Sequence, residues 1–284
     1  MKRYAIPFLF MPFITFAHED HHIGKWNFDP FLLISLLLIT VFYMTGLRNL
    51  KKIKSFSLLS FAGSIFFLLL ALFSPVDFWS DELQTWHMIQ HMIIMVIAAP
   101  LFILGRPMFV LLWSLPSSIR RKLGSLYGWL MGRGIGHYIF WHPLILWLFF
   151  GFTLWIWHLP SLYEAALLNQ RLHDFQHISF FVSSVFFWRI LIDPISRYRP
   201  KKGLAIFYIF ATTLHASLLG LFLALSQGTW YKYYLNKTAT WGLTPLEDQQ
   251  VAGLIMWMPG CMIYVIAAAL IFHQWLKKNQ TEEQ

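Results

Sequence analysis

Apolar and polar positions alternate along the chain in long blocks rather than within single helical turns. Seven apolar runs are separated by short polar loops, and they cover residues 30–47, 56–73, 85–104, 143–158, 173–191, 203–225 and 249–272. A helix needs about 20 apolar residues to cross a bilayer, and the shorter runs reach that length by tilting or by using flanking residues. Backbone polar groups in lipid must be paired within the segment, so we expect an all-α bundle of seven transmembrane helices.

An eighth apolar stretch, at the N-terminus, is too short to span a bilayer. The chain begins MKRYAIPFLFMPFITFA, in which Lys2 and Arg3 precede the apolar residues. This pattern is typical of a signal peptide, and we predict that residues 1–17 are removed by cleavage after Ala17. An uncleaved anchor is the alternative. Residues 18–284 contain no linker or compositional break, so we expect them to form a single membrane domain.

Lys and Arg are distributed unequally between the two sets of loops, and this predicts the orientation of the bundle. Short cytoplasmic loops carry an excess of Lys and Arg. The loops after the first, third, fifth and seventh runs hold Arg48, Lys51, Lys52, Lys54, Arg106, Arg120, Arg121, Lys122, Arg133, Arg189, Arg197, Arg199, Lys201, Lys202, Lys277 and Lys278. The opposite side has only Lys25, Arg171, Lys232 and Lys237. We therefore expect the mature N-terminus outside and the C-terminus in the cytoplasm.

Composition supports a membrane protein and narrows the possible chemistry. The 284 residues are 57% hydrophobic and 12% charged, about half the charged fraction of a soluble domain. The net charge of +9 does not indicate nucleic-acid binding, because the basic residues lie in loops between spans rather than on a solvated binding face. Cys261 is the one cysteine in the sequence, which excludes an internal disulfide and a Cys-x-x-Cys metal site.

The pentapeptide pattern His-x-x-Gln-His occurs twice, each time at the start of an apolar run. It is HMIQH at residues 87–91 and HDFQH at residues 173–177, and both runs begin on the predicted outer side. Residues four apart share a helix face, so both imidazoles of a pair can point to the same place between helices. Ionisable side chains inside spans are costly and indicate function by default. We therefore predict that His87, His91, His173 and His177 form a shared metal site.

Other polar and sulfur-containing residues fall near these pairs in the predicted topology. His158 closes the fourth run on the outer side, and His215 lies roughly 15 Å into the sixth run at 1.5 Å per residue. Both are candidate ligands, although an interfacial His or a helix-packing His would explain each one. The thioethers of Met88, Met256 and Met258 are candidate Cu(I) ligands, with ordinary core packing as the alternative. Asp248, Gln249 and Gln250 open the seventh run as a further polar cluster.

Four motifs follow one another along the chain: WHMIQHMIIMVIAAPLFILGRP, WIWHLPSLYEAAL, HDFQH and PLEDQQVAGLIMWMPG. Together they resemble the CtaG family, seven-helix membrane proteins needed for assembly of caa3-type cytochrome c oxidase. The resemblance extends from the first span to the last. It implies a non-enzymatic factor of the bacterial plasma membrane that helps copper reach oxidase subunits. At the positions that match the family motifs, the resemblance implies functional roles for His87, His91, His158, His173, His177, Asp248, Gln249 and Gln250.

The residues and the resemblance lead to one hypothesis with two alternatives. We expect capture of a copper ion on the outer side, followed by its transfer to an oxidase subunit. A haem-binding oxidoreductase is the first alternative, because two His residues from facing helices can ligate haem iron. A metal or proton transporter is the second, although the inner halves of the spans offer few polar groups. A hydrolase has little support, because no nucleophile with a base at motif spacing occurs.

Overall fold

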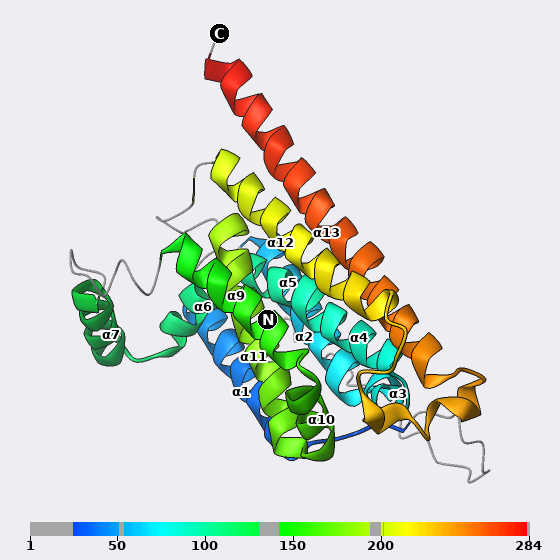
Figure 1. The fold of residues 1–284 in the computed structure, drawn as a ribbon. Coiled ribbons are helices and arrows are strands. Elements are labelled where there is room, and N and C mark those ends of the chain that lie inside the picture. Colours follow the sequence, from blue (N-terminus) through cyan, green and yellow to red (C-terminus); the bar gives the residue numbers. More distant parts are fainter. Residues whose placement is uncertain (1–24, 51–53, 131–141, 194–199, 201, 283–284) are drawn as a thin grey trace.

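The described residues fold into a bundle of helices (Figure 1). The computed structural model describes residues 25–50, 54–130, 142–193, 200 and 202–282, and every regular element in these ranges is a helix. The predicted signal peptide at residues 1–17 lies outside the described residues. The elements, in chain order, are α1 Pro30–Asn49, α2 Ser55–Phe73, α3 Pro75–Glu82, α4 Gln84–Met92, η1 Ile93–Ala98, α5 Ala99–Leu104, α6 Pro107–Ser114, α7 Ser117–Leu130, α9 Pro143–Trp157, α10 Pro160–Leu168, α11 Gln170–Ile192, α12 Lys202–Ala224, η2 Lys232–Tyr234, η3 Thr238–Trp241 and α13 Pro245–Glu282.

The expected membrane spans are confirmed, with one qualification at the fourth. Six helical stretches of the described chain are long and apolar enough to cross a bilayer, and they coincide with all the predicted runs except 143–158. At that run, α9 reaches the required length only together with α10, and the two are bent by 74°. Pro160 begins α10, and a proline disfavours the helical conformation of the residue before it, so the bend falls at Leu159. The structure therefore has six spans, or seven if the bent pair is counted as one.

The third span contains a wider helical turn that is explained by a proline. Residues Ile93–Ala98 form a π-helix between α4 and α5, and the N–H of Ala99 donates to the carbonyl of Ile94, five residues earlier. The next carbonyl in this pattern, that of Met95, would need the N–H of residue 100, and Pro100 has none. The indole Nε1–H of Trp188 donates to Met95 O instead, at 3.0 Å. A side chain of α11 thus completes the backbone pairing of the third span.

Two close helix contacts depend on glycine. α12 and α13 form an antiparallel pair, and a Cβ at Gly253 would lie 2.6 Å from the carbonyl oxygen of Gly220. At the other side of the bundle, a Cβ at Gly46 of α1 would lie 2.0 Å from the carbonyl oxygen of Val110 in α6. Neither approach is possible with a larger residue. These contacts fix α13 against the bundle and hold α6 across one end of α1.

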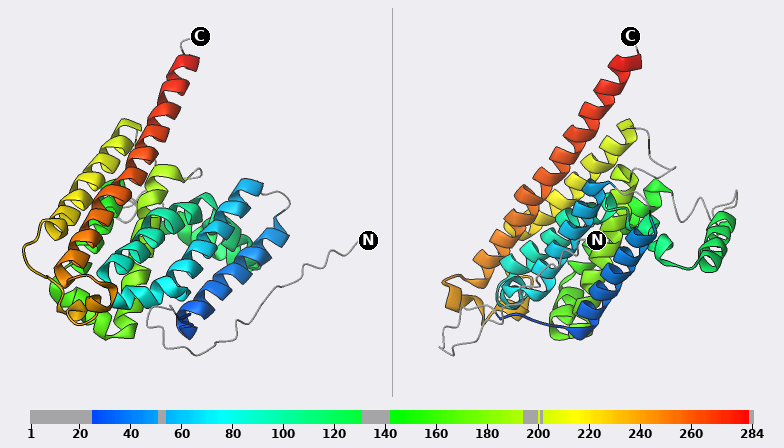
Figure 2. Two further views of the ribbon diagram at one scale, coloured as in Figure 1. Left: turned by 90° about the vertical axis from the view of Figure 1, so that its right-hand side faces the viewer. Right: turned by 180° about the vertical axis from the view of Figure 1, so that it is seen from behind.

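Two helices extend away from this core. α13 continues past the end of α12, and α7 is set apart from the bundle beyond α6 (Figures 1 and 2). The spans together enclose a large apolar core, which includes residues from α4, η1, α5, α9, α11, α12 and the first part of α13. Exposed side chains on the outward faces of α1 and α13 are mostly large and apolar, as expected for helix faces in contact with lipid.

Candidate functional site

The two His pairs occupy matching positions on two helices that begin at the same end of the bundle. His87 and His91 lie three and seven residues after the first residue of α4, and His173 and His177 lie three and seven residues after the first residue of α11. At 1.5 Å per residue, the second His of each pair is about 10 Å along its helix. His87 and His173 therefore lie at the same depth along their helices, and His91 and His177 lie together one turn deeper.

The four imidazoles come together as the sequence predicts. Ring centroids within each pair are 4.2 Å apart. Across the two helices, the centroids of His87 and His173 are 5.4 Å apart, and those of His91 and His177 are 5.3 Å apart. The diagonal from His87 to His177 is 6.4 Å. The rings thus form an approximate rectangle between α4 and α11, and we call these four residues the His cluster.

Aromatic side chains close the His cluster on two sides. The ring of Tyr163, from α10, is 5.0 Å from that of His87. The ring of Phe180, one turn further along α11, is 4.6 Å from that of His91. Both aromatic residues are buried, and His87 and His91 are only 0% and 1% exposed. The cluster is therefore shielded from solvent in this conformation.

His158 stands beside the cluster at the C-terminus of α9. Its Nδ1 lies 2.7 Å from the carbonyl oxygen of Leu154, which fixes the proton on Nδ1 and leaves the lone pair on Nε2. The His158 ring is 6.4 Å from that of Tyr163 and 6.3 Å from that of Phe180. It thus contacts the two residues that enclose the cluster, and its Nε2 is available to a ligand.

Many ring nitrogens at this site have no protein partner. Among the described residues, buried atoms without a hydrogen bond include both nitrogens of His87 and His91 and the Nε2 atoms of His158, His173 and His177. Leaving one buried polar atom unpaired costs about 1–3 kcal/mol. In the same ranges, however, no group of three or more His, Cys, Asp or Glu side chains already has its ligating atoms around one ion. The rings are close enough to share a ligand but must turn to do so.

The N-terminus of α4 is capped from another helix. Leu83 occupies the N-cap position and offers no side-chain acceptor. The carboxylate of Asp248, in the first turn of α13, accepts instead from the backbone N–H groups of Gln84 at 2.7 Å and Thr85 at 3.0 Å. A carboxylate at a helix N-terminus also interacts favourably with the helix dipole. Asp248, predicted as a functional residue, therefore positions α4 and with it His87.

Gln90, the glutamine of HMIQH, joins α4 to two neighbouring elements. Its Nε2 donates to the carbonyl of Ala71 in α2 and to Oδ1 of Asp77 in α3, both at 2.8 Å. The other carboxylate oxygen of Asp77 accepts from Asn27 Nδ2 at 2.8 Å. Burial raises the pKa of Asp77 to about 6, although these two hydrogen bonds act in the opposite direction. Gln90 thus fixes the rotation of α4 that turns its His residues inward.

The two glutamines that follow Asp248 hold the loop between α12 and α13. Gln249 Oε1 accepts from the backbone N–H of Trp230 at 2.6 Å, and Gln250 Nε2 donates to the carbonyl of Ser226 at 3.1 Å. Burial raises the pKa of Tyr231 and Tyr234, in the same loop. The hydroxyl of Tyr231 donates to the carbonyl of His158. These predicted functional residues therefore order the loop that covers the site.

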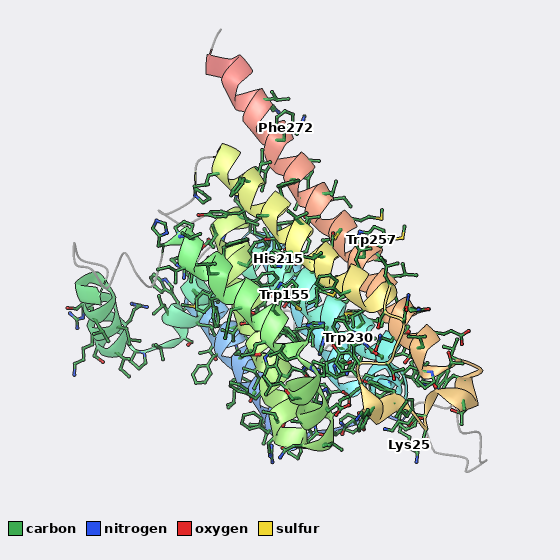
Figure 3. All side chains as sticks on the ribbon, viewed as in Figure 1. Lys25, Trp155, His215, Trp230, Trp257 and Phe272 are labelled. Carbon is green, nitrogen blue, oxygen red and sulfur yellow. The ribbon has the colours of Figure 1, made fainter. Side chains whose placement is uncertain are left out.

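The remaining candidate ligands, three Met residues and His215, lie in different surroundings. Met88 and Met256 are buried in the same apolar cluster as Tyr163. Met258 is 60% exposed and is not part of the buried site. His215 lies on α12 towards the middle of the bundle, away from the loop that carries Trp230 (Figure 3). Its ring packs against Trp147 of α9 at 5.8 Å, and both of its ring nitrogens are buried without a hydrogen bond among the described residues.

Some residues of the site were not predicted as such. Tyr163 belongs to the motif WIWHLPSLYEAAL but was not predicted as a site residue, yet its ring closes the cluster. Its place five residues after His158, across the bend at Pro160, was the available signal. Asp77 lies between two apolar runs, and nothing in its local sequence indicates a contact with Gln90. The contact between Trp188 and Met95 joins residues 93 positions apart and has no signal in a single sequence.

Fold and site together define a multi-pass membrane protein with a buried cluster of histidines at one end of its bundle. Comparison with known proteins is more specific. The family model described as "Cytochrome c oxidase caa3 assembly factor" matches residues 41–278. The chain belongs to this family, as its motifs indicate.

Its curated relatives are distant and longer. An uncharacterized protein of Mycobacterium bovis is 22% identical over 265 residues, which cover 90% of this chain and 40% of the relative. An uncharacterized protein of Mycobacterium leprae is 21% identical over 267 residues, or 89% of this chain and 40% of the relative. The chain thus spans about 40% of the length of the curated relatives it matches. No solved structure matches it.

Proposed function

We propose that this chain is a non-enzymatic assembly factor of the bacterial plasma membrane that holds copper at the His cluster and passes it to a caa3-type cytochrome c oxidase. Family membership supports the oxidase as the partner. The observation that supports a metal is the group of buried ring nitrogens without partners at His87, His91, His158, His173 and His177. The distribution of Lys and Arg supports placing this end of the bundle outside.

The spacing of the rings suits a metal ion. Two imidazoles that share one ion have ring centroids roughly 5–6 Å apart, because each ring nitrogen lies about 2 Å from the metal. The pairs that face each other across α4 and α11 are 5.4 and 5.3 Å apart. The proposal requires the rings to turn about their side-chain torsions so that their nitrogens face the same ion. Imidazole nitrogen binds copper well, and a copper ion would pair the nitrogens that now lack a partner.

The surroundings favour entry and exit of the ion at the same end. Beyond His91 and His177, the core continues as Phe180, Phe187 and Trp188, which are apolar and buried. On the other side, the loop helix α3 carries Asp77, Asp81 and Glu82, whose charges raise the local concentration of cations. An ion that enters from this side must leave by it. This arrangement suits transfer to a partner on the outer face better than transport across the membrane.

The haem alternative fits the geometry poorly. Axial ligation needs a His on each face of a flat macrocycle, with free space around the iron in the plane between them. Here the diagonal pair, His87 and His177, has the right separation at 6.4 Å. His91 and His173 stand between its members, however, each within 5.4 Å of both rings. A porphyrin cannot enter without separating α4 from α11.

The first experiment is to measure copper and iron in the purified protein by elemental mass spectrometry after Cu(I) loading in detergent. We expect about one copper per chain in the wild type and none in a variant with Ala at His87, His91, His173 and His177. His273→Ala, at an exposed residue of α13, is the matched control and should retain copper. Circular dichroism and gel filtration check the fold of each variant. Iron in place of copper, or copper retained in the folded quadruple variant, would contradict the proposal.

A second experiment tests the oxidase as the destination of the copper. Cells that lack the gene are complemented with the wild type or with the quadruple variant, and copper is measured in the isolated oxidase. We expect the variant to accumulate in the membrane but to leave the oxidase deficient in copper. An oxidase with normal copper would show that the chain assists assembly without handling metal.

A further inference from the structure

The helix α7 differs from every other long helix of the described chain in its surroundings. It spans Ser117–Leu130 and follows α6 at the end of the bundle opposite the His cluster. It lies apart from the bundle in Figure 1 and in the right-hand view of Figure 2. Each of residues 117–126 is exposed except Arg120. The bundle therefore neither buries nor supports this helix.

α7 is nevertheless amphipathic. Ile119, Leu123 and Leu126 follow the i, i+4, i+7 spacing that places side chains on one helix face, and all three are exposed. At 100° per residue, Arg120 and Lys122 fall on the two borders of this stripe, while Arg121 lies on the opposite face. A narrow apolar stripe bordered by Lys and Arg is the pattern of helices that lie in a membrane interface, where long basic side chains extend towards the headgroups.

The charge of α7 is uncompensated. No Asp or Glu occurs between Glu82 and Glu164. Arg120 stacks on the ring of Trp113, with its guanidinium carbon 4.1 Å from the ring centroid. Within the part of the chain that is described, Arg120, Arg121 and Lys122 form no ion pair. The positive charge of Arg120 and Lys122, on the borders of the stripe, is therefore available to an anion outside the bundle.

The position of α6 brings α7 to the level of a membrane surface. α6 crosses the C-terminal end of α1, where Asn49 Nδ2 donates to the carbonyl of Trp113 at 2.8 Å. Arg48, in the last turn of α1, and Lys54, just before α2, lie at the same end. The span α1 ends here, so α7 begins where the hydrocarbon of the bilayer gives way to headgroups.

We propose that α7 lies flat in this interface, with its apolar stripe towards the acyl chains, and that Arg120 and Lys122, on the two borders of the stripe, bind the headgroups of anionic phospholipids. The ligand is the lipid phosphate with its net negative charge, and charge complementarity distinguishes it from a zwitterionic headgroup. Each basic residue near an anionic membrane contributes a factor of about five to binding. Removal of both should therefore weaken the insertion of α7 about 25-fold.

The test uses the full chain in nanodiscs of two compositions. One is phosphatidylcholine alone, and the other is phosphatidylcholine with about 30% phosphatidylglycerol, which gives the surface a negative potential. Cys261→Ser removes the native thiol, and Ile119→Cys then carries an environment-sensitive fluorophore. Ser125→Cys, on the polar face of α7, is the matched control for the label. We expect a blue-shifted emission and quenching by spin-labelled lipid for residue 119 in the anionic discs only. The shift should weaken with salt.

Charge variants separate this proposal from its rivals. Arg120→Gln with Lys122→Gln should return the label at residue 119 to an aqueous environment, whereas the control Arg48→Gln with Lys54→Gln should leave it in lipid. Equal insertion in both disc compositions would overturn the role of anionic lipid. A label that stays in water in every disc would overturn membrane binding and leave α7 as a site for an acidic protein surface. If α7 does not bind anionic lipid, the proposal of copper binding at the His cluster is unaffected, because the cluster lies at the opposite end of the bundle from α7.

Discussion

The two copies of His-x-x-Gln-His have the same spacing but are held in different ways. On α11, the helix start is capped locally, because Asn169 Oδ1 accepts from the N–H of Leu172 at 3.2 Å. On α4, the cap comes from Asp248, 164 residues away from Gln84. Gln90 is hydrogen bonded to α2 and α3, whereas the side-chain atoms of Gln176 have no partner among the described residues.

The contrast indicates that α4 depends on its surroundings and α11 does not. α11 is a continuous helix of 23 residues, and its His pair is placed by local structure. α4 has nine residues before the π-helix begins, and other elements must supply its cap and its rotation. A repeated motif can thus serve one site while its two copies have unequal structural requirements. The predictions below test this asymmetry.

The largest expected effect is at the long-range cap of α4. Asp248→Ala leaves the buried N–H of Gln84 without an acceptor and should lower the free energy of unfolding by about 3 kcal/mol. Asn169→Ala removes the local cap of α11 and should cost about 1 kcal/mol. Equilibrium unfolding in detergent, followed by circular dichroism, measures both. Equal losses would contradict the asymmetry.

The two glutamines form a matched pair for the next test. Gln90→Leu leaves the Ala71 carbonyl and an oxygen of Asp77 unpaired and should destabilise the protein by about 2 kcal/mol. Gln176→Leu removes a buried amide that has no partner, so stability should stay the same or rise by up to about 1 kcal/mol. Unfolding of the metal-free protein is the measurement. A comparable loss from Gln176→Leu would mean that its amide has a ligand within the site.

Asp77 should make the α4 side of the site sensitive to pH. Its pKa is raised to about 6 by burial, above the value of about 3.9 in an unfolded chain. The folded state therefore binds the proton more tightly, and the stabilisation present below pH 4 is lost as the pH rises to about 6. The effect is up to about 3 kcal/mol. Asp77→Asn should remove this slope between pH 4 and 6, and an unchanged slope would assign it to other groups.

The smallest expected effect concerns the link from α11 back to the third span. Trp188→Phe keeps most of the ring but leaves the Met95 carbonyl without its donor, and should cost about 1 kcal/mol. Hydrogen exchange should increase locally in Ile93–Ala98 rather than along α11. Faster exchange in α11 alone would show that the indole supports its own helix and not the π-helix.

The sequence predicted most of the fold because its strongest signals are local. Apolar runs gave the span boundaries to within a few residues, and the i, i+4 spacing placed both imidazoles of each pair on one face. The position of both pairs at the outer start of their runs also predicted that they would meet. The bend at Leu159 was missed, because residues 143–158 were treated as a complete span although Pro160 follows directly.

The parts that could not be predicted depend on contacts between distant segments. Asp248 was predicted only as a functional residue of unspecified role, and the structure shows its carboxylate at the start of α4. The partner of Gln90 was hidden for the same reason, since Asp77 resembles any charged loop residue. Met258 was chosen for its sulfur, but the rotation of α13 exposes it. Spacing along one helix does not reveal which face meets the rest of the bundle.

The most direct test of the central proposal is the copper content of two double variants, His87→Ala/His91→Ala and His173→Ala/His177→Ala. If the four rings form one site, each variant loses all the copper that the wild type binds, because two imidazoles from one helix cannot retain it through purification. If each helix holds its own ion, each variant retains about half. Retention of half the copper, or an absence of copper in the folded wild type, would contradict a shared copper site.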